Sequence, residues 1–175
     1  MIDKLKKIKA LAFDIDGVLT DGTLLATPDG DVLRTFEAKD AFGLRMAEMH
    51  GMTIAFITGG TSESIAKRGV YLGIAPEDIY LHSKDKLKDF NAFCDKHGFS
   101  PDEVMYFGDD IPDIPVIQAC GVGAVPSDAV PEAREAADYV SPYAGGHGFV
   151  RNTVEMLLKA QDAWHLDVRK YDSMF

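Results

Sequence analysis

The chain has 175 residues, of which 46% are hydrophobic and 26% charged, the composition of an ordinary globular domain that spans residues 1–175. Its net charge of −10 repels nucleic acid and anionic lipid, so we expect neither as a partner. No apolar run could span a bilayer and the first residues lack the apolar region of a signal peptide, which predicts a cytoplasmic protein.

The first predicted element is a buried strand over residues 8–13, and two carboxylates, Asp14 and Asp16, follow it. Because side chains alternate along a strand, both leave on the same face. Such a pair repels itself unless a hard cation such as Mg²⁺ binds there. The alternative is a turn in which both aspartates only cap backbone amides.

Residues 23–37 are predicted to form a β-hairpin flap, because two short apolar segments flank Thr-Pro-Asp-Gly at 27–30. The core of a sheet does not need this hairpin, yet it has apolar side chains to bury. These are Leu24, Leu25, Val32, Leu33 and Phe36.

Strands and helices alternate along the rest of the chain. Asp40 is expected to cap a helix over 41–50, and a buried strand over 53–57 ends at Thr58. A third buried strand, 104–107, precedes an acidic pair. Further helices are expected from Thr61 or Ser62 to 72 and over 86–97, 112–120, 131–137 and 149–164, with short strands over 121–125 and 138–140. This alternation predicts an α/β fold, a doubly wound parallel sheet with helices on both faces.

The strands end in polar groups in a fixed order: Asp14 and Asp16; Thr58 with Gly59 and Gly60; Lys86; then Asp109 with Asp110 and Asp113. This order resembles the haloacid dehalogenase superfamily of phosphotransferases. Residues 16–22, 39–43, 108–110 and 145–151 are more closely similar to the capless 3-deoxy-D-manno-octulosonate 8-phosphate phosphatases. The resemblance implies an enzyme of lipopolysaccharide biosynthesis that removes phosphate from a sugar acid.

The resemblance also implies roles for the acidic residues. Asp14 attacks phosphorus and forms an aspartyl-phosphate, and Asp16 acts as general acid and then base. Asp109 holds Mg²⁺ together with Asp14 and the backbone carbonyl of Asp16. Asp110 and Asp113 are either outer ligands of the metal or anchors for the lysine.

A lysine and a phosphate-binding loop complete the implied site. Lys86 is favoured over Lys84, because only Lys86 lies between an acidic residue and a leucine at a helix start. Thr58, Gly59 and Gly60 would bind the phosphate.

Three positions bear on the sugar part of the substrate. Gly60 stands where the octulosonate phosphatases have Arg and the nine-carbon relatives have Glu, which weakens the assignment of substrate. Arg68 matches a family arginine that faces a neighbouring subunit's substrate. Lys39 stands where the family often has Arg, and an ordinary surface lysine is an equal reading.

The spacing between the motifs leaves no room for a cap domain, which needs on the order of 50 residues or more. In the resembling family, tetramers cover the site instead, and the hairpins pack together. We therefore expect a homotetramer, with a monomer and a simple surface flap as the alternative. The tail, residues 165–175, is expected either to reach a neighbouring site or to fray.

Two other functions compete with the octulosonate 8-phosphate reading. A nine-carbon ketodeoxynonulosonate or sialic acid 9-phosphate is the close alternative. A phospho-accepting receiver domain is the distant one, because receivers also combine Asp, Thr and Lys on a doubly wound sheet. Receivers place the acidic pair early and the lysine late, whereas here Asp109 and Asp110 follow Lys86.

Overall fold

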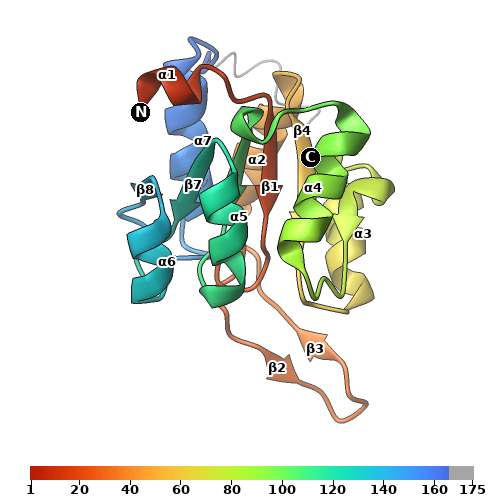
Figure 1. The fold of residues 1–175 in the computed structure, drawn as a ribbon. Helices are drawn as coiled ribbons and strands as arrows, with labels where there is room; N and C mark the ends of the chain where they lie inside the picture. Colours follow the sequence, from red (N-terminus) through yellow and green to blue (C-terminus); the bar gives the residue numbers. More distant parts are fainter. Residues whose placement is uncertain (166–175) are drawn as a thin grey trace.

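The computed structural model describes residues 1–165 and has a central six-stranded parallel sheet (Figure 1). Its strand order is β5 (Ile79–Tyr80), β4 (Thr53–Ile57), β1 (Ala10–Phe13), β6 (Val104–Phe107), β7 (Val122–Val125) and β8 (Tyr139–Val140). The helices are α1 (Ile2–Leu5), α2 (Ala38–Met49), α3 (Glu63–Tyr71), α4 (Lys86–His97), α5 (Ile114–Ala119), α6 (Pro131–Ala136) and α7 (Phe149–Ala160). Single 3₁₀ turns cover Pro76–Asp78, Pro101–Glu103 and Ile111–Asp113.

Two apolar layers sandwich the sheet, which confirms the predicted doubly wound architecture. One layer contains the buried faces of α2 and α7, and the other those of α4, α5 and α6. All four residues of β1 are buried, as expected of a strand covered on both faces.

The register of the central strands explains why polar groups gather at one edge. Phe13 at the end of β1 pairs with Phe56 of β4 on one side and Phe107 of β6 on the other. Because the three strands are parallel and end at nearly the same level, the residues that follow them meet at the carboxyl edge of the sheet.

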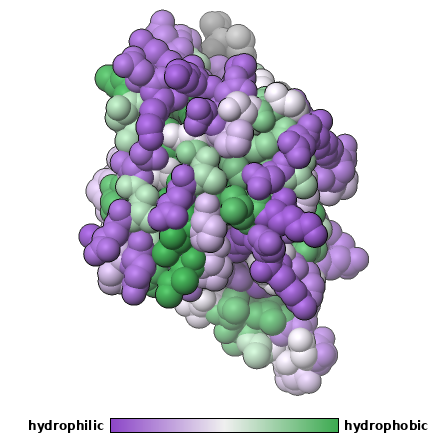
Figure 2. Space-filling model, in the orientation of Figure 1, coloured by the Kyte–Doolittle hydropathy of each residue, from purple (hydrophilic) through white to green (hydrophobic). Residues whose placement is uncertain are grey.

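The predicted hairpin is present and extends beyond this edge (Figure 1). It consists of β2 (Leu25–Ala26) and β3 (Val32–Leu33), paired antiparallel. Figure 2 shows hydrophobic surface on the projecting part of the molecule, where Leu24, Leu25 and Leu33 are 48%, 64% and 50% exposed.

The start of α2 differs from the prediction. The helix begins at Ala38, and its cap is Glu37, whose carboxylate accepts hydrogen bonds from the backbone N–H groups of Lys39 and Asp40. Asp40 is buried and instead accepts from the backbone N–H groups of Gly148 and Arg151, at 3.3 and 2.8 Å. The predicted capping residue therefore joins α2 to the first turn of α7.

Helix α7 ends at Ala160, four residues before the predicted end. The side chain of Gln161 donates hydrogen bonds to the carbonyls of Leu5 and Ile8, both at 2.8 Å. Asp162 then adopts a positive φ of 54°, which no α-helix allows. The predicted tail lies almost wholly in residues 166–175, outside the described residues.

Within residues 1–165, no helix has the length and apolar character needed to cross a membrane.

Candidate active site

A largely buried lysine joins two carboxylates at the carboxyl edge of the sheet. The Nζ atom of Lys86 lies 2.9 Å from Oδ2 of Asp14 and 2.6 Å from Oδ1 of Asp113. Asp14 follows β1 and Lys86 begins α4, so strand order and helix start together position the pair. Lys84, the other candidate, is exposed.

Asp113 is fully buried and is an anchor for its neighbours. Besides Lys86, its carboxylate accepts hydrogen bonds from the Tyr106 hydroxyl at 2.6 Å and from the backbone N–H groups of Asp109 and Asp110, at 3.0 and 3.2 Å. These four donors satisfy the hydrogen-bonding capacity of both carboxylate oxygens of Asp113. The side chain of Asp110 is exposed and accepts a hydrogen bond from the backbone N–H of Ile111 at 2.7 Å.

Asp109 has the features of a metal ligand. Its Oδ1 atom is buried and has no hydrogen-bond partner among the described residues. Oxygens of Asp14, Asp109 and Asp113 lie within 4.8 Å of one another, and since the Asp113 carboxylate is already satisfied, Asp14 and Asp109 are left to hold a cation. Carboxylate oxygens are the ligands that Mg²⁺ prefers, so the residues present fit this ion.

The electrostatics of the cluster favour the same ion. Burial, with the charges of Asp14 and Asp113, raises the pKa of Asp109 to about 8. Burial and the charge of Asp113 also raise the pKa of Asp14, to about 6. For Lys86, burial opposes the charged form, but Asp14 and Asp113 outweigh it and raise its pKa. The cluster therefore has three carboxylates and one ammonium group, and a further cation would stabilise it.

The loop after β4 is built from small residues that leave its backbone open. Thr58 is buried, and its hydroxyl oxygen accepts from the backbone N–H of Gly60 at 3.1 Å. A Cβ on Gly59 would meet nothing closer than the carbonyl oxygen of Ser83 at 3.9 Å, so the backbone is open there. Small residues of this kind allow a phosphate to approach backbone amides.

Asp16 has a partner that the sequence reasoning missed. Arg34, which follows β3 in the hairpin, donates from Nε to Oδ1 of Asp16 at 2.6 Å and from Nη2 to Oδ2 at 2.9 Å. This hydrogen bond raises the pKa of Arg34. The sequence does contain a signal for this pair, since Arg34 is the one Lys or Arg residue between positions 23 and 37 and the predicted hairpin begins close to Asp16.

The glycine-rich segment 145–148 packs on the loop after β1. A Cβ on Gly145 would lie 1.8 Å from the carbonyl oxygen of Gly17, and one on Gly146 would lie 2.5 Å from the backbone of Thr20 and Asp21. Segment 145–148 therefore needs glycine, because its backbone touches the backbone next to the acidic cluster.

Arg68 and Lys39 have other surroundings. The guanidinium of Arg68 lies 5.6 Å from the ring centre of Phe36 and 5.4 Å from that of Tyr71, and its Nε is buried without a hydrogen-bond partner in the described part of the chain. Lys39 is exposed and lines a hollow of about 530 Å³ with residues of segment 143–148 and of α7. None of the acidic cluster lines this hollow.

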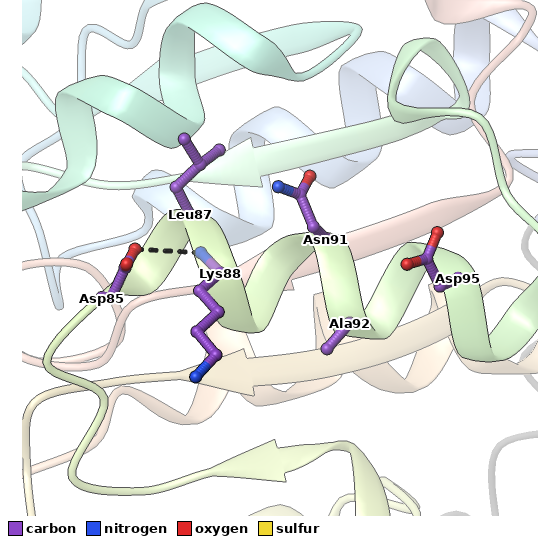
Figure 3. Close-up of a pocket in the computed structure, with 6 residues that line it drawn as sticks. All are labelled: Asp85, Leu87, Lys88, Asn91, Ala92 and Asp95. Atoms are coloured by element: carbon purple, nitrogen blue, oxygen red, sulfur yellow. Dashed lines mark hydrogen bonds between the residues drawn. The ribbon is translucent and has the colours of Figure 1, made fainter.

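A second hollow, of about 470 Å³, runs along α4 (Figure 3). It is lined by Asp85, Leu87, Lys88, Asn91, Ala92 and Asp95. The Asp85 carboxylate is occupied there in accepting the backbone N–H of Lys88 at 3.0 Å, as the cap of the helix. The lining contains no predicted site residue, so this hollow is not part of the candidate site.

Comparison with known proteins places the chain in a family. A sequence model of haloacid dehalogenase-like hydrolases matches residues 71–151. The 3-deoxy-D-manno-octulosonate 8-phosphate phosphatase of Escherichia coli K12 is 36% identical over 161 residues, which cover 92% of this chain and 85% of the relative.

Solved structures agree in fold. The octulosonate 8-phosphate phosphatase of Moraxella catarrhalis, in complex with magnesium, phosphate and KDO, is 31% identical, with a TM-score of 0.91 over 98% of this chain and 97% of that one. The cobalt-bound phosphatase of Haemophilus influenzae is 31% identical, with a TM-score of 0.87 over 91% and 92% of the two chains. The chain belongs to the 3-deoxy-D-manno-octulosonate 8-phosphate phosphatase family of haloacid dehalogenase-like hydrolases.

Proposed function

We propose that the chain is a Mg²⁺-dependent phosphatase that hydrolyses 3-deoxy-D-manno-octulosonate 8-phosphate. The observation that carries this proposal is the cluster in which Asp14 pairs with Lys86 while Asp109 presents a buried oxygen that has no hydrogen-bond partner in the described part of the chain. Phosphoryl transfer requires a nucleophile, positive charge and a metal-binding oxygen close together, and this cluster has all three. The identity of the sugar acid in this proposal comes from the substrate for which the relatives are named.

Each residue of the cluster has a part in the proposed reaction. An oxygen of Asp14 attacks phosphorus, and the bond between phosphorus and the sugar oxygen breaks, which leaves an aspartyl-phosphate. Asp16 gives a proton to the departing oxygen and later takes one from the attacking water. Lys86 and the Thr58 loop neutralise and orient the phosphoryl oxygens.

Mg²⁺ would be held by the Asp14 and Asp109 carboxylates and the backbone carbonyl of Asp16, where it supplies positive charge to the transferring phosphoryl group. Asp113 holds Lys86 and the backbone of residues 109 and 110, so in this proposal it is an anchor and not a ligand. Asp110 would not hold the ion, because its side chain caps the 3₁₀ turn.

Phosphate release across a panel of esters tests the proposal. The octulosonate 8-phosphate should be the best substrate by kcat/KM, with activity lost in EDTA and restored by Mg²⁺. Faster turnover of a nine-carbon ulosonate 9-phosphate would move the assignment to the close alternative. Equal rates on unrelated sugar phosphates would contradict a sugar-acid substrate. A long-lived aspartyl-phosphate without turnover would favour a receiver domain.

We further infer a homotetramer of chains that each form one phosphatase domain. Support comes from the exposed leucines of the hairpin and from Val70 and Tyr71 of α3, which are 49% and 58% exposed. The guanidinium of Arg68 lies between the ring of Phe36 at the base of the hairpin and the ring of Tyr71, so the proposed assembly face also carries a positive charge. A cytoplasmic location is proposed as well, because Cys94 and Cys120 are buried free thiols.

A further inference from the structure

We infer that Arg34 is a positioning residue for Asp16, so that the hairpin orients the group that protonates the leaving oxygen. This inference rests on the proposed phosphatase function. Both oxygens of Asp16 accept hydrogen bonds from one guanidinium, at 2.6 and 2.9 Å. A bidentate contact fixes the plane of a carboxylate as well as its place, which a single donor does not.

The guanidinium is itself well fixed. The Arg34 side chain is only 4% exposed, whereas that of Asp16 is 29% exposed. The Nη1 atom of Arg34 also donates to the carbonyl of Val32 at 3.4 Å. Asp16 therefore depends on its partner for a fixed orientation, because its side chain is partly exposed and water does not fix the plane of a carboxylate.

Gly60 leaves the space that Arg34 uses. A Cβ at position 60 would lie 3.3 Å from Nη2 of Arg34 and 2.7 Å from Cδ1 of Ile65. Any larger residue there must move the guanidinium or the core side chain. The glycine and the arginine thus form one arrangement, in which the hairpin's cation lies between Asp16 and the loop that follows Thr58.

A second contact ties the hairpin to the same edge of the sheet. The hydroxyl of Ser62, the cap of α3, donates to Oδ1 of Asp31 at 3.3 Å. The side chain of Arg68 also lies over Phe36, at the base of the hairpin. The hairpin is therefore held at three points by its own chain, and Arg34 is the one that reaches a reacting group.

Two substrates with different leaving groups distinguish a role of Arg34 in positioning Asp16 from a role in binding phosphate. Formation of the aspartyl-phosphate from a sugar ester needs a proton from Asp16, because a sugar alkoxide is a poor leaving group. Acetyl phosphate loses acetate, which leaves without a proton. The value of kcat/KM covers only the steps up to this intermediate, and hydrolysis of the intermediate is common to both substrates.

The experiment compares kcat/KM for octulosonate 8-phosphate and acetyl phosphate in the wild type, Arg34→Gln and Arg34→Lys. In Arg34→Gln we expect a loss of roughly 10- to 100-fold for the sugar ester and less than about threefold for acetyl phosphate. The loss in Arg34→Lys should be intermediate, since lysine keeps the positive charge but cannot make the bidentate contact of a guanidinium. Arg134→Gln, an exposed arginine of α6, is the matched control and should change neither value.

A double variant adds a second test. Asp16→Asn should show the same selective loss, and Arg34→Gln should add little to it, because both act through one carboxylate. Equal losses on both substrates, no loss on either, or full additivity with Asp16→Asn would overturn the inference. If the wild type cleaves another sugar phosphate better, the substrate assignment fails, but the same ratio measured on that ester still decides the role of Arg34.

Discussion

The backbone of Gly17 lies against the carboxylate of Asp109, so closely that a Cβ on Gly17 would be 2.0 Å from Oδ2 and 2.5 Å from Cγ. Gly17 also has a φ of +86°, which residues with a side chain rarely adopt. The residue after the Asp-x-Asp pair is therefore glycine for two reasons. It turns the chain after β1, and it leaves room for the partly buried carboxylate of Asp109, which follows β6.

Replacing Gly17 should displace Asp109 from the cluster. In Gly17→Ala we expect Mg²⁺ affinity, measured by titration calorimetry, to fall at least about 10-fold, the low end of the effect of disturbing a metal site. Gly30→Ala is the matched control, because Gly30 has a φ of +87° but a Cβ built there has no atom of residues 1–165 within 4 Å. It should lose about 1 kcal/mol of stability and keep its Mg²⁺ affinity. Equal Mg²⁺ binding in both variants would contradict this reading.

Removal of the Lys86 charge should affect both stability and turnover. Lys86→Met leaves Asp14 and Asp113 buried without their cation, so the free energy of unfolding should fall by about 3 kcal/mol, and kcat by roughly 100-fold or more. Denaturant unfolding and steady-state kinetics measure the two effects. Lys84→Met, at an exposed position two residues earlier, should leave both unchanged. A comparable loss in Lys84→Met would show that the wrong lysine has been assigned.

The Tyr106 hydroxyl tests the anchoring role of Asp113. Tyr106→Phe removes a fully buried hydrogen bond of 2.6 Å to a carboxylate, while Lys86 and two backbone N–H groups remain. We expect a loss of about 1.5–3 kcal/mol in the free energy of unfolding, as for hydrogen bonds to charged groups. Tyr143→Phe, at an exposed tyrosine, should cost nearly nothing. If Tyr106→Phe is as stable as the wild type, the hydroxyl is not needed to hold Asp113.

Stabilisation by Mg²⁺ should increase with pH. The folded, metal-free protein has raised pKa values at Asp14, about 6, and Asp109, about 8, so it binds more protons than the unfolded chain above pH 4. Its stability from these groups is present at low pH and is lost as pH rises toward 8. Mg²⁺ competes with those protons, so the rise in Tm on adding Mg²⁺ should be larger at pH 8.5 than at pH 6.

Thermal unfolding with Mg²⁺ or EDTA at both pH values measures this difference. Asp109→Asn removes the group with the higher pKa, so in that variant the Mg²⁺ effect should be small at both pH values. A Mg²⁺ effect in the wild type that does not change between pH 6 and 8.5 would contradict the proposed coupling of metal and protons.

The hairpin leucines test the proposed assembly. Leu25→Ser with Leu33→Ser should release monomers, because these two side chains are paired across the hairpin and are 64% and 50% exposed in the single chain. Light scattering coupled to gel filtration gives the mass. Met49→Ser, at a 45% exposed apolar residue at the end of α2, is the control and should stay assembled. A wild type that is monomeric and fully active at micromolar concentration would refute the tetramer.

The periodicity of the sequence was sufficient to predict the parallel sheet, because buried strands and amphipathic helices have different repeats and each is ended by its own residues. Helix α4 is the clearest case, since Lys86–His97 is bounded by an Asp85 cap and by Gly98 in the left-handed conformation. The order of polar groups at the strand ends likewise predicted the family that the comparisons show.

Local signals were less reliable where distant segments compete for the same group. Asp40 looks like a helix cap, but the backbone N–H groups of Gly148 and Arg151, more than 100 residues away, take its carboxylate. Glu37 then caps α2 in its place. No pattern near Asp40 contains this information, because the competing donors come from the other end of the chain.

The sequence by itself thus determined the fold, the residues at the strand ends and the family, since these depend on local periodicity and on the order of motifs. Only the tertiary structure decided which side chains pair with one another. It placed Asp113 beside Lys86, left one oxygen of Asp109 with no hydrogen-bond partner within residues 1–165, and brought Arg34 across from the hairpin to Asp16. Such contacts depend on how parallel strands end in register and on how far a side chain reaches, which spacing along the chain does not specify.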